Sequence, residues 1–283
     1  MRRSAASEKN KQIGDLSDWS RRKSNSKLFE HVLSEMTEKY KVGNGGRMVI
    51  GLVGSTDYFS VMLRNAQSIL RWNRQPSLWS HAFLIAEAWD GQSNINRVPI
   101  LEIPMFPRSE RFYRLESNGL CQTATLGDYA DADVDANIAL LTVIRRNPGA
   151  EGQPPTLSPL TDEDVGKLTE RAKQPNFDRL RFAFWDWMRE WQQYLWSEAE
   201  GRNPLREGIP IPSSAYIEMT YQALNCDLVP GAAERNGAPE HLWNAAMWWH
   251  QNTTELALGD VSPFLMSGAY AIRDPGATIQ LGK

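Results

Sequence analysis

Short apolar runs and longer stretches with helical spacing follow one another along this chain. Four runs have the length and composition of buried strands: residues 48–53, 78–88, 98–103 and 137–144. Apolar residues that recur every three or four positions predict helices over four other stretches: residues 28–40, 60–72, 177–196 and 239–249. A further helix is expected after Thr161, because Asp164 three positions later completes a helix-cap pattern. The chain therefore mixes strands with helices, and it shows no internal repeat.

Between these elements lie segments to which the pattern assigns no helix or strand. Residues 147–159 and 201–212 are rich in Pro and Gly and are predicted to be loops, and residues 256–272 give a mixed pattern. Residues 1–27 are basic and rich in Ser, which predicts a disordered tail, with a docking or delivery signal as the alternative. We therefore expect one domain over residues 28–283, with a helical insert around residues 158–200.

Composition narrows the class of protein. With 283 residues, of which 41% are hydrophobic, the chain can bury a sizeable core. Its net charge of -3 at pH 7 provides no basic field, so we expect no nucleic-acid partner. No run approaches the roughly 18 apolar residues that a transmembrane segment needs, and no apolar stretch follows Arg2 and Arg3 as it would in a cleavable signal peptide. We expect a cytoplasmic protein in the producing cell, or one secreted by a machine that needs no signal peptide.

The two cysteines, Cys121 and Cys226, do not suggest a disulfide framework in so long a chain, which indicates a reducing compartment. They lack metal-ligand spacing, as do His31, His241 and His250, so the sequence predicts no metal site and no cofactor. Cys226 is expected to be a small buried hydrophobe, and a nucleophilic Cys121 would require a different fold from the one considered below. The 11 tryptophans are expected to pack in the core rather than to form a sugar or base platform.

Three segments carry groups that acyl transfer requires: a nucleophile, a base and a residue that orients the base. His81 lies in an otherwise apolar strand, so its imidazole is either satisfied in a core or open to a cleft. Glu102 interrupts another apolar strand; on an adjacent strand it would accept a hydrogen bond from His81, and otherwise it lies on a solvated face. Ser213 follows Pro212 at a predicted helix start, where it is either a helix N-cap or a nucleophile served by the helix dipole and backbone N–H groups.

The order of these segments resembles the permuted branch of the NlpC-type papain-like superfamily, which includes bacterial YiiX-like proteins and is related to lecithin-retinol acyltransferase. The matching segments follow one another in order over roughly residues 45–245, and each motif alone is short. They are, in order, Gly46-Arg47-Met48-Val49-Ile50, Ser80-His81-Ala82-Phe83, Leu101-Glu102-Ile103, residues 126–145, residues 177–196, Ser213-Ser214-Ala215-Tyr216-Ile217 and Asp227-Leu228-Val229-Pro230. Two positions depart from the family pattern: Arg47 stands in place of the usual Asp, and Ser213 in place of the nucleophilic Cys.

The resemblance implies an α+β, circularly permuted papain-like fold in which a small antiparallel sheet packs against helices. It also implies that His81 is the base, Glu102 its orienter and position 213 the nucleophile. Ser80, Ser214 and Tyr216 flank these positions and are expected to contact substrate. Ser213 itself has three explanations: a Cys-to-Ser change introduced to disable the protein, a natural serine that works with the histidine more slowly than a thiol would, or a silent cleft.

The sequence therefore favours an enzyme, a cysteine-peptidase-like amide hydrolase that cleaves a peptide or isopeptide bond. Bacterial cell-wall peptide, a peptidoglycan fragment, is the substrate class that the resemblance favours. An antibacterial toxin with an immunity or delivery protein as partner is one form of this hypothesis, and a cytoplasmic enzyme acting on another substrate is a second form. Two alternatives remain. One is a catalytically silent protein that binds a peptide, glycan or protein through the same cleft and its Trp-rich helix; the other is a lipid acyltransferase or thioesterase.

Overall fold

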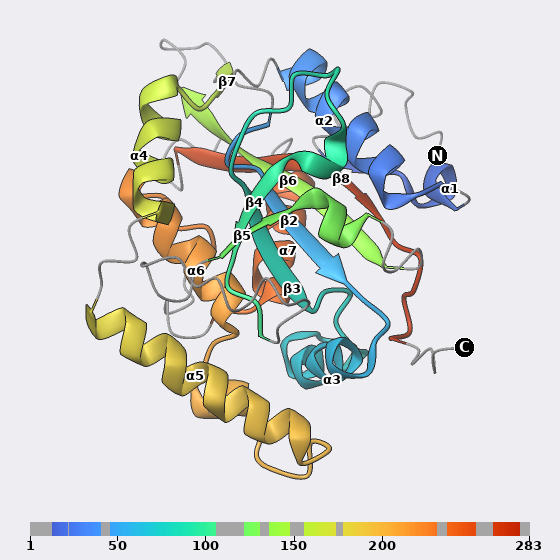
Figure 1. Cartoon of the computed structure of the whole chain (residues 1–283), viewed down its shortest axis with the longest axis vertical. Helices are drawn as coiled ribbons and strands as arrows, with labels where there is room; N and C mark the ends of the chain where they lie inside the picture. Colours follow the sequence, from blue (N-terminus) through green and yellow to red (C-terminus); the bar gives the residue numbers. More distant parts are fainter. Residues whose placement is uncertain are drawn as a thin grey trace.

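The chain folds as an α+β protein around one sheet, described here from a computed structural model (Figure 1). The structure describes residues 13–21, 23–40, 46–105, 122–130, 136–147, 156–173, 178–230, 237–252 and 263–277. Within these residues the sheet has eight strands in the order β1-β8-β6-β2-β3-β4-β5, and β7 pairs with β6 outside this path. The strands are β1 (Ile13–Asp15), β2 (Ile50–Gly54), β3 (His81–Ile85), β4 (Pro99–Glu102), β5 (Gln122–Thr125), β6 (Asn137–Asn147), β7 (Thr156–Pro159) and β8 (Phe264–Ala271).

Helices cover both faces of this sheet. They are α1 (Ser17–Ser20), α2 (Asn25–Tyr40), α3 (Tyr58–Ala66), α4 (Asp162–Lys173), α5 (Asp178–Trp196), α6 (Pro212–Tyr221) and α7 (Pro239–Asn252), with short 3-10 turns η2 (Gln67–Leu70) and η5 (Leu126–Tyr129) among the connections. One face packs against α2, whose Leu28 and Phe29 share a core with Phe83 of β3. The other packs against α4, α6 and α7, and there Ile217 shares a core with Leu84. Residues of β3 therefore alternate between two separate cores.

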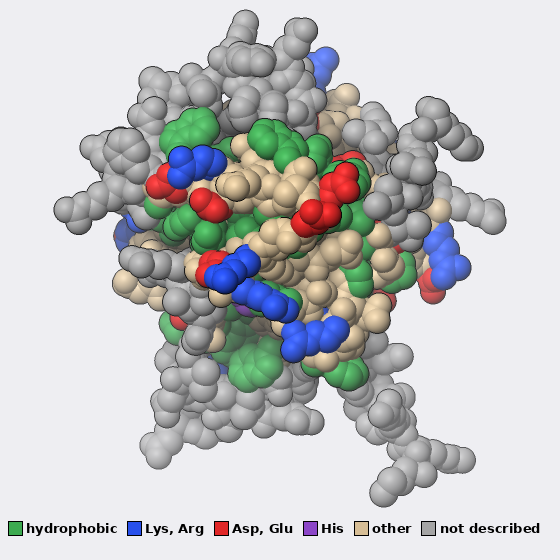
Figure 2. Space-filling view, turned by 90° about the horizontal axis from the view of Figure 1, so that it is seen from below, with side chains coloured by type: hydrophobic (Ala, Val, Ile, Leu, Met, Phe, Trp, Pro, Cys, Tyr) green, Lys and Arg blue, Asp and Glu red, His purple; other side chains and the backbone are tan. Residues whose placement is uncertain are grey.

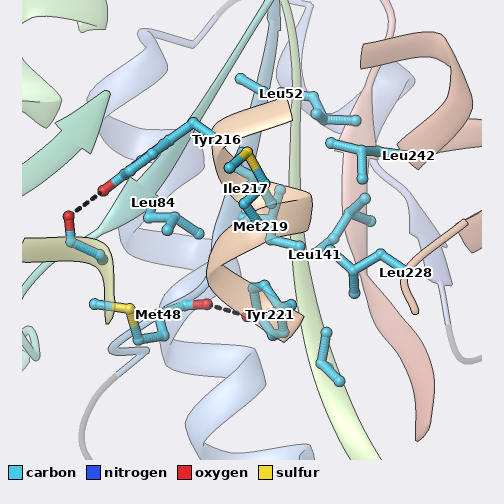
Figure 3. Packing of buried hydrophobic residues seen from close by; sticks show 14 of the residues in the cluster. Met48, Leu52, Leu84, Leu141, Tyr216, Ile217, Met219, Tyr221, Leu228 and Leu242 are labelled. Atoms are coloured by element: carbon cyan, nitrogen blue, oxygen red, sulfur yellow. Dashed lines mark hydrogen bonds between the residues drawn. The ribbon is translucent and has the colours of Figure 1, made fainter. Parts of the chain in front are cut away.

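Helix α6 runs along β3, and hydrogen bonds fix its direction. At its end, the Tyr221 hydroxyl donates to Met48 O at 2.6 Å, and Met48 N donates to Ile85 O at 2.7 Å, where β3 ends. Figure 3 shows Tyr221 and Met48 together at one end of this helix and Leu52 beside its other end. Leu52 pairs with Ala82 near the start of β3. The first turn of α6 therefore lies at the end of the sheet where His81 begins its strand.

Most predicted elements are present with shifted ends. The predicted helix 60–72 stops at Ala66, and after the turn η2 Trp72 is 95% exposed. The predicted helix cap is confirmed, because the Thr161 hydroxyl donates to Asp164 Oδ2 at 2.8 Å and Asp164 N donates back to Thr161 Oγ1 at 3.2 Å. The N-terminal boundary needs correction: β1, α1 and the start of α2 all lie within the expected tail, of which residues 1–12 are outside the described residues.

The sheet is also larger than expected and is not wholly antiparallel. Strand β7 lies in a predicted loop, β8 lies in the stretch that the pattern left unassigned, and β5 had no prediction at all. Strand β1 runs parallel to β8, with Ile13 opposite Gly268, whereas the other pairs are antiparallel. The three-residue strand β1 is too short to show a hydrophobic pattern of its own, and it forms because its backbone pairs with the longer strand β8.

The surface carries charges of both signs. Figure 2 shows basic and acidic side chains among hydrophobic ones on the same face of the molecule. The Trp-rich helix α5 is divided between core and surface, because Trp191 is fully buried while Trp185 and Trp196 are exposed. None of the helices in the described part of the chain has both the length and the apolar composition that crossing a bilayer requires.

Candidate active site

His81 and Glu102 meet inside the protein, as expected from their strands. His81 opens β3, Glu102 closes β4, and the two antiparallel strands place Leu84 opposite Leu101. The His81 Nε2 atom lies 2.7 Å from Glu102 Oε2. Both side chains are buried, with exposed fractions of 7% for His81 and 3% for Glu102. Burying a carboxylate beside a ring nitrogen is stable only when the two are hydrogen-bonded, and this contact meets that need.

Tyr129 completes this contact from a third segment. Its hydroxyl donates to Glu102 Oε2, the same oxygen that lies next to the imidazole. Its ring stacks on Phe83 with centroids 5.0 Å apart and lies nearly parallel to the His81 ring at 6.0 Å. Tyr129 ends the turn η5, which begins with a capping box between Thr125 and Asp128. The buried carboxylate is thereby held in one position, with donors on both sides.

The arrangement determines which imidazole nitrogen is available for chemistry. An ionised carboxylate only accepts hydrogen bonds, so Nε2 carries the proton that faces Glu102. The neutral ring then has its lone pair on Nδ1, and no hydrogen bond to Nδ1 is found among the described residues. A carboxylate at Nε2 also stabilises the imidazolium that forms when Nδ1 takes up a proton. The His81–Glu102 pair thus has the organisation of an oriented general base.

Ser213 lies on the first turn of α6. Proline at position 212 is the first helical residue, Ile211 precedes it, and no side chain caps this terminus. The Ser213 hydroxyl is buried, with the residue 1% exposed, and its Oγ has no hydrogen-bond partner in the described part of the chain. The helix N-cap alternative for Ser213 is therefore wrong. A buried, unpartnered hydroxyl at an uncapped helix N-terminus is costly for structure, and it is common where a polar group serves a reaction.

The two candidate groups approach the end of the sheet from opposite sides. Alternation along β3 places His81 on the side of Phe83, which faces Tyr129 and the core of α2. Helix α6 packs on the other side, where Leu84 and Ile217 share a core. His81 is the first residue of its strand, so the end of the sheet is where both groups lie. No hydrogen bond joins Ser213 to His81 in this structure.

The residues expected to contact substrate all bond within the fold. Ser80 Oγ donates to Val53 O at 3.2 Å, and Ser214 Oγ donates to Ile211 O at 3.2 Å. The Tyr216 hydroxyl donates to Ala172 O at 3.0 Å and links α6 to α4. These contacts are structural, and the substrate-binding role of the three side chains stays a prediction.

None of the remaining candidates that the structure describes contributes to a second site. Cys226 is buried, and burial raises the pKa of its thiol to about 12, as expected for an inert hydrophobe. Cys121 lies outside the described residues. His31 stacks on Trp19 at 4.3 Å and contacts Glu35 on the surface of α2, while His241 and His250 lie in α7. Among the described residues, no group of three or more side chains is placed to hold a metal ion.

The sequence did not point to Tyr129, because nothing in its spacing links it to Glu102, 27 residues earlier. The only available signal was the turn pattern Leu126-Gly127-Asp128-Tyr129, which marks a bend without indicating what the ring faces. Comparisons of the chain with models of known protein families, with curated proteins and with solved structures found no match.

Proposed function

We propose that this protein is a papain-like amide hydrolase in which His81 is the base, Glu102 orients it and position 213 carries the nucleophile. One observation carries the proposal: a buried imidazole is held by a buried carboxylate at 2.7 Å, at the end of the sheet where an unpartnered hydroxyl occupies an uncapped helix N-terminus. Base and orienter are in contact, and the helix supplies partial positive charge where an oxyanion would form.

The reaction follows from these groups. His81 Nδ1 removes the proton from the nucleophile at position 213, which attacks the carbonyl carbon of the amide. Pro212 has no N–H, and the N–H groups of Ser214 and Ala215 donate to Ile211 O, so the N–H of residue 213 and the positive end of the α6 dipole stabilise the oxyanion. The imidazolium returns the proton to the leaving amine as the C–N bond breaks. A water molecule then gives a proton to the imidazole and hydrolyses the acyl-enzyme. The bond between the acyl carbon and the nucleophile breaks, the imidazolium returns its proton to the nucleophile, and the carboxylic acid is released.

The reaction requires a contact between His81 and the group at position 213, and the Ser213 hydroxyl makes no hydrogen bond to His81 in the structure. Proton transfer needs base and nucleophile within hydrogen-bond reach, about 2.6–3.2 Å between heavy atoms, so the free protein must be able to reach this distance. His81 and Ser213 lie on opposite sides of the sheet at this end. The proposal therefore requires their side chains to meet just past the first residue of β3.

A peptide or isopeptide bond in bacterial cell-wall peptide is the substrate that we propose, on the strength of the family resemblance. A serine in a site organised for a thiolate reacts slowly, because a hydroxyl ionises far less readily than a thiol with a pKa of about 8.5. We therefore expect Ser213→Cys to raise the cleavage rate.

The test compares four proteins on purified cell-wall peptides: the chain as given, Ser213→Cys, Ser213→Cys with His81→Ala, and Ser213→Cys with Glu102→Gln. We expect the cysteine form to cleave, the His81→Ala form to lose at least about 100-fold in kcat/KM, and the Glu102→Gln form to lose about 10-fold or more. Cleavage that is unchanged by His81→Ala would contradict the site. Binding without cleavage by all four proteins would instead favour a silent cleft that recognises peptide.

A further inference from the structure

The four residues before His81 form a buried segment without regular structure. Ser77, Trp79 and Ser80 are each at most 1% exposed, although residues 77–80 belong to no helix or strand. Buried carbonyl groups in such a segment need hydrogen-bond donors from elsewhere in the fold. Three successive carbonyls, those of residues 77, 78 and 79, accept hydrogen bonds from side chains of other elements.

Each donor comes from a different buried polar residue. Arg64 Nε of α3 donates to Ser77 O at 2.8 Å, and Asn137 Nδ2 of β6 donates to Leu78 O at 3.0 Å. Gln67 Nε2 of η2 donates to Trp79 O at 2.8 Å, immediately beside Ser80 and His81. We call residues 77–80 with these three side chains the clamp. The clamp fixes the direction from which the chain enters β3.

Gln67 has the central place in the clamp because both ends of its amide are used. Besides donating to Trp79 O, it accepts a hydrogen bond from Glu240 N at 3.0 Å, at the start of α7. Glu240 in turn accepts from Ser77 Oγ at 2.6 Å. Burial raises the pKa of the Glu240 carboxyl, and Arg71 Nε lies 3.5 Å from it. A single amide thus joins the segment before His81 to η2 and α7.

The clamp and its neighbours include charged groups whose burial costs desolvation free energy. Arg64 is fully buried and pairs with Asp274 at 2.6 Å, and Glu240 is buried next to it in the same network. Apolar side chains of similar volume often give equal or greater stability than buried charges, so stability alone does not account for this network. The geometry fixed here is the start of β3, where Ser80 N donates to Val53 O at 2.8 Å and His81 lies opposite Val53.

We propose that Gln67 is a positioning residue that holds His81 in the orientation from which its Nδ1 meets the nucleophile. This inference rests on the proposed function of His81 and position 213. Gln67 acts through the Trp79 carbonyl, two residues before the imidazole, and touches no substrate. Loss of its hydrogen bonds would let residues 77–80 shift while His81 keeps its contact with Glu102, and displacement of a reacting group by about 1 Å can reduce a rate by about 100-fold.

The experiment measures thiol chemistry, so it needs no substrate. In the Ser213→Cys background, iodoacetamide alkylation of the cysteine at position 213 is followed by peptide-resolved mass spectrometry between pH 4 and pH 10, which separates it from Cys121 and Cys226. A thiolate paired with an imidazolium reacts well below the thiol's ordinary pKa of about 8.5. Gln67→Met keeps the volume and removes the hydrogen bonds. We expect it to lower the alkylation rate below pH 7 about tenfold and to leave the rate above pH 9 unchanged.

Two further variants make the result decisive. Asn203→Ala removes another side-chain amide bond to the end of α3, to Ala66 O at 2.7 Å, away from residues 77–80; the low-pH rate should stay as in the parent. Ser77→Ala removes the hydroxyl that donates to Glu240 or Trp79 O and accepts from Trp79 N, without adding volume, and should lower the low-pH rate about threefold. If circular dichroism shows that Gln67→Met does not fold, the rate of Ser77→Ala tests the positioning role instead.

The variants distinguish the positioning role of Gln67 from the proposed pairing of His81 with position 213. If His81→Ala leaves the low-pH reactivity unchanged, the pairing of His81 with position 213 is wrong. If His81→Ala abolishes it while Gln67→Met and Ser77→Ala keep it, the site stands and the positioning role is overturned. An equal loss in Asn203→Ala would also overturn it, because the effect would then follow general destabilisation.

Discussion

At the scale of single residues, the candidate site depends on close contacts between side chains that are far apart in sequence. Tyr129 lies between Phe83 and the carboxylate of Glu102, with its hydroxyl on Glu102 and its ring on Phe83. The Phe83 ring in turn lies over Gly51 on the neighbouring strand, where any side chain would overlap it. The glycine within β2 is thus explained by an aromatic stack whose other end, Tyr129, bonds Glu102.

Removing the Tyr129 hydroxyl tests how much the carboxylate depends on it. Tyr129→Phe should lower the free energy of unfolding by about 1–3 kcal/mol, because Glu102 loses a buried donor. In the Ser213→Cys form it should lower kcat several-fold more than it changes KM, because the orienter and not the substrate is affected. Steady-state kinetics and urea unfolding measure the two effects.

The matched control for this prediction is Tyr221→Phe. It also removes a buried tyrosine hydroxyl bond, the one to Met48 O at 2.6 Å, but at the far end of α6. The two variants should be similarly destabilised, and only Tyr129→Phe should lose kcat. Equal losses of kcat in both would show that Tyr129 serves stability alone.

The sequence predicted part of this site for a definite physical reason. His81 and Glu102 stand out because a polar group inside an apolar strand needs a hydrogen-bond partner, and a neighbouring strand of the sheet can provide it. Tyr129 and Gln67 do not stand out, because an aromatic residue or an amide is ordinary in a turn or a helix. Asn137 does not stand out either, because an amide at the first residue of a strand does not reveal its partners. Their roles come from tertiary contacts that no spacing encodes.

At the scale of elements, strands with strong patterns were predictable and strands formed by pairing were not. The run of β6 is apolar over most of its length and is buried between β2 and β8, so its pattern was evident. In β8 the run is interrupted by Ser267 and Gly268, and this glycine has a positive φ of 153° opposite the backbone of Leu141. Both residues weaken the sequence signal of a strand that β6 holds in register over its whole length.

Helix α4 is attached to β6 by a charge pair that makes its anchoring depend on pH. Arg145 Nε and an Arg145 terminal nitrogen donate to both carboxylate oxygens of Asp164, at 2.8 and 2.6 Å. These bonds, followed by those from Thr161, hold the pKa of Asp164 well below its ordinary value. The folded pKa lies below the unfolded one, so this stability is present above about pH 4 and is lost as pH falls towards the folded pKa.

We therefore expect Asp164→Asn to destabilise the protein by about 1–3 kcal/mol at pH 7, with the difference from the unchanged protein shrinking below about pH 4. Urea unfolding at pH 7, 5 and 3 measures it. The control is Asp162→Asn, an exposed carboxylate on the same helical turn, which should change stability by less than about 0.5 kcal/mol at each pH. A difference for Asp164→Asn that stays constant from pH 7 to pH 3 would contradict the assignment.

At the scale of the whole molecule, one buried ion pair connects the site region to the last part of the sheet. Arg64 of α3 pairs with Asp274, which follows β8, and Asn137 of β6 accepts from Asp274 N at 2.8 Å. The same Arg64 supports the segment before His81. Helix α3, the central strand β6 and the chain after β8 thus meet at one buried polar centre.

Breaking this pair should destabilise the whole fold rather than one helix. Asp274→Ala leaves a buried guanidinium without its carboxylate and should cost about 3–5 kcal/mol in the free energy of unfolding. With Arg64→Met added, the combined loss should be smaller than the sum of the two single losses, because the unpaired charge is gone. Chemical denaturation of the four proteins gives the coupling; losses that simply add would show that the two groups do not interact.

The sheet order also governs when the protein can complete its fold during synthesis. Strand β6 has β2 on one side and β8 on the other, and β1 has β8 as its neighbour. As the ribosome makes the chain from its first strand onward, β1 and one edge of β6 emerge long before the strand that covers them. That edge stays open to other chains until Ala271 has left the exit tunnel. Chaperone demand should therefore last until β8 has emerged, and nascent chains stalled before Phe264 are the ones that we expect to associate.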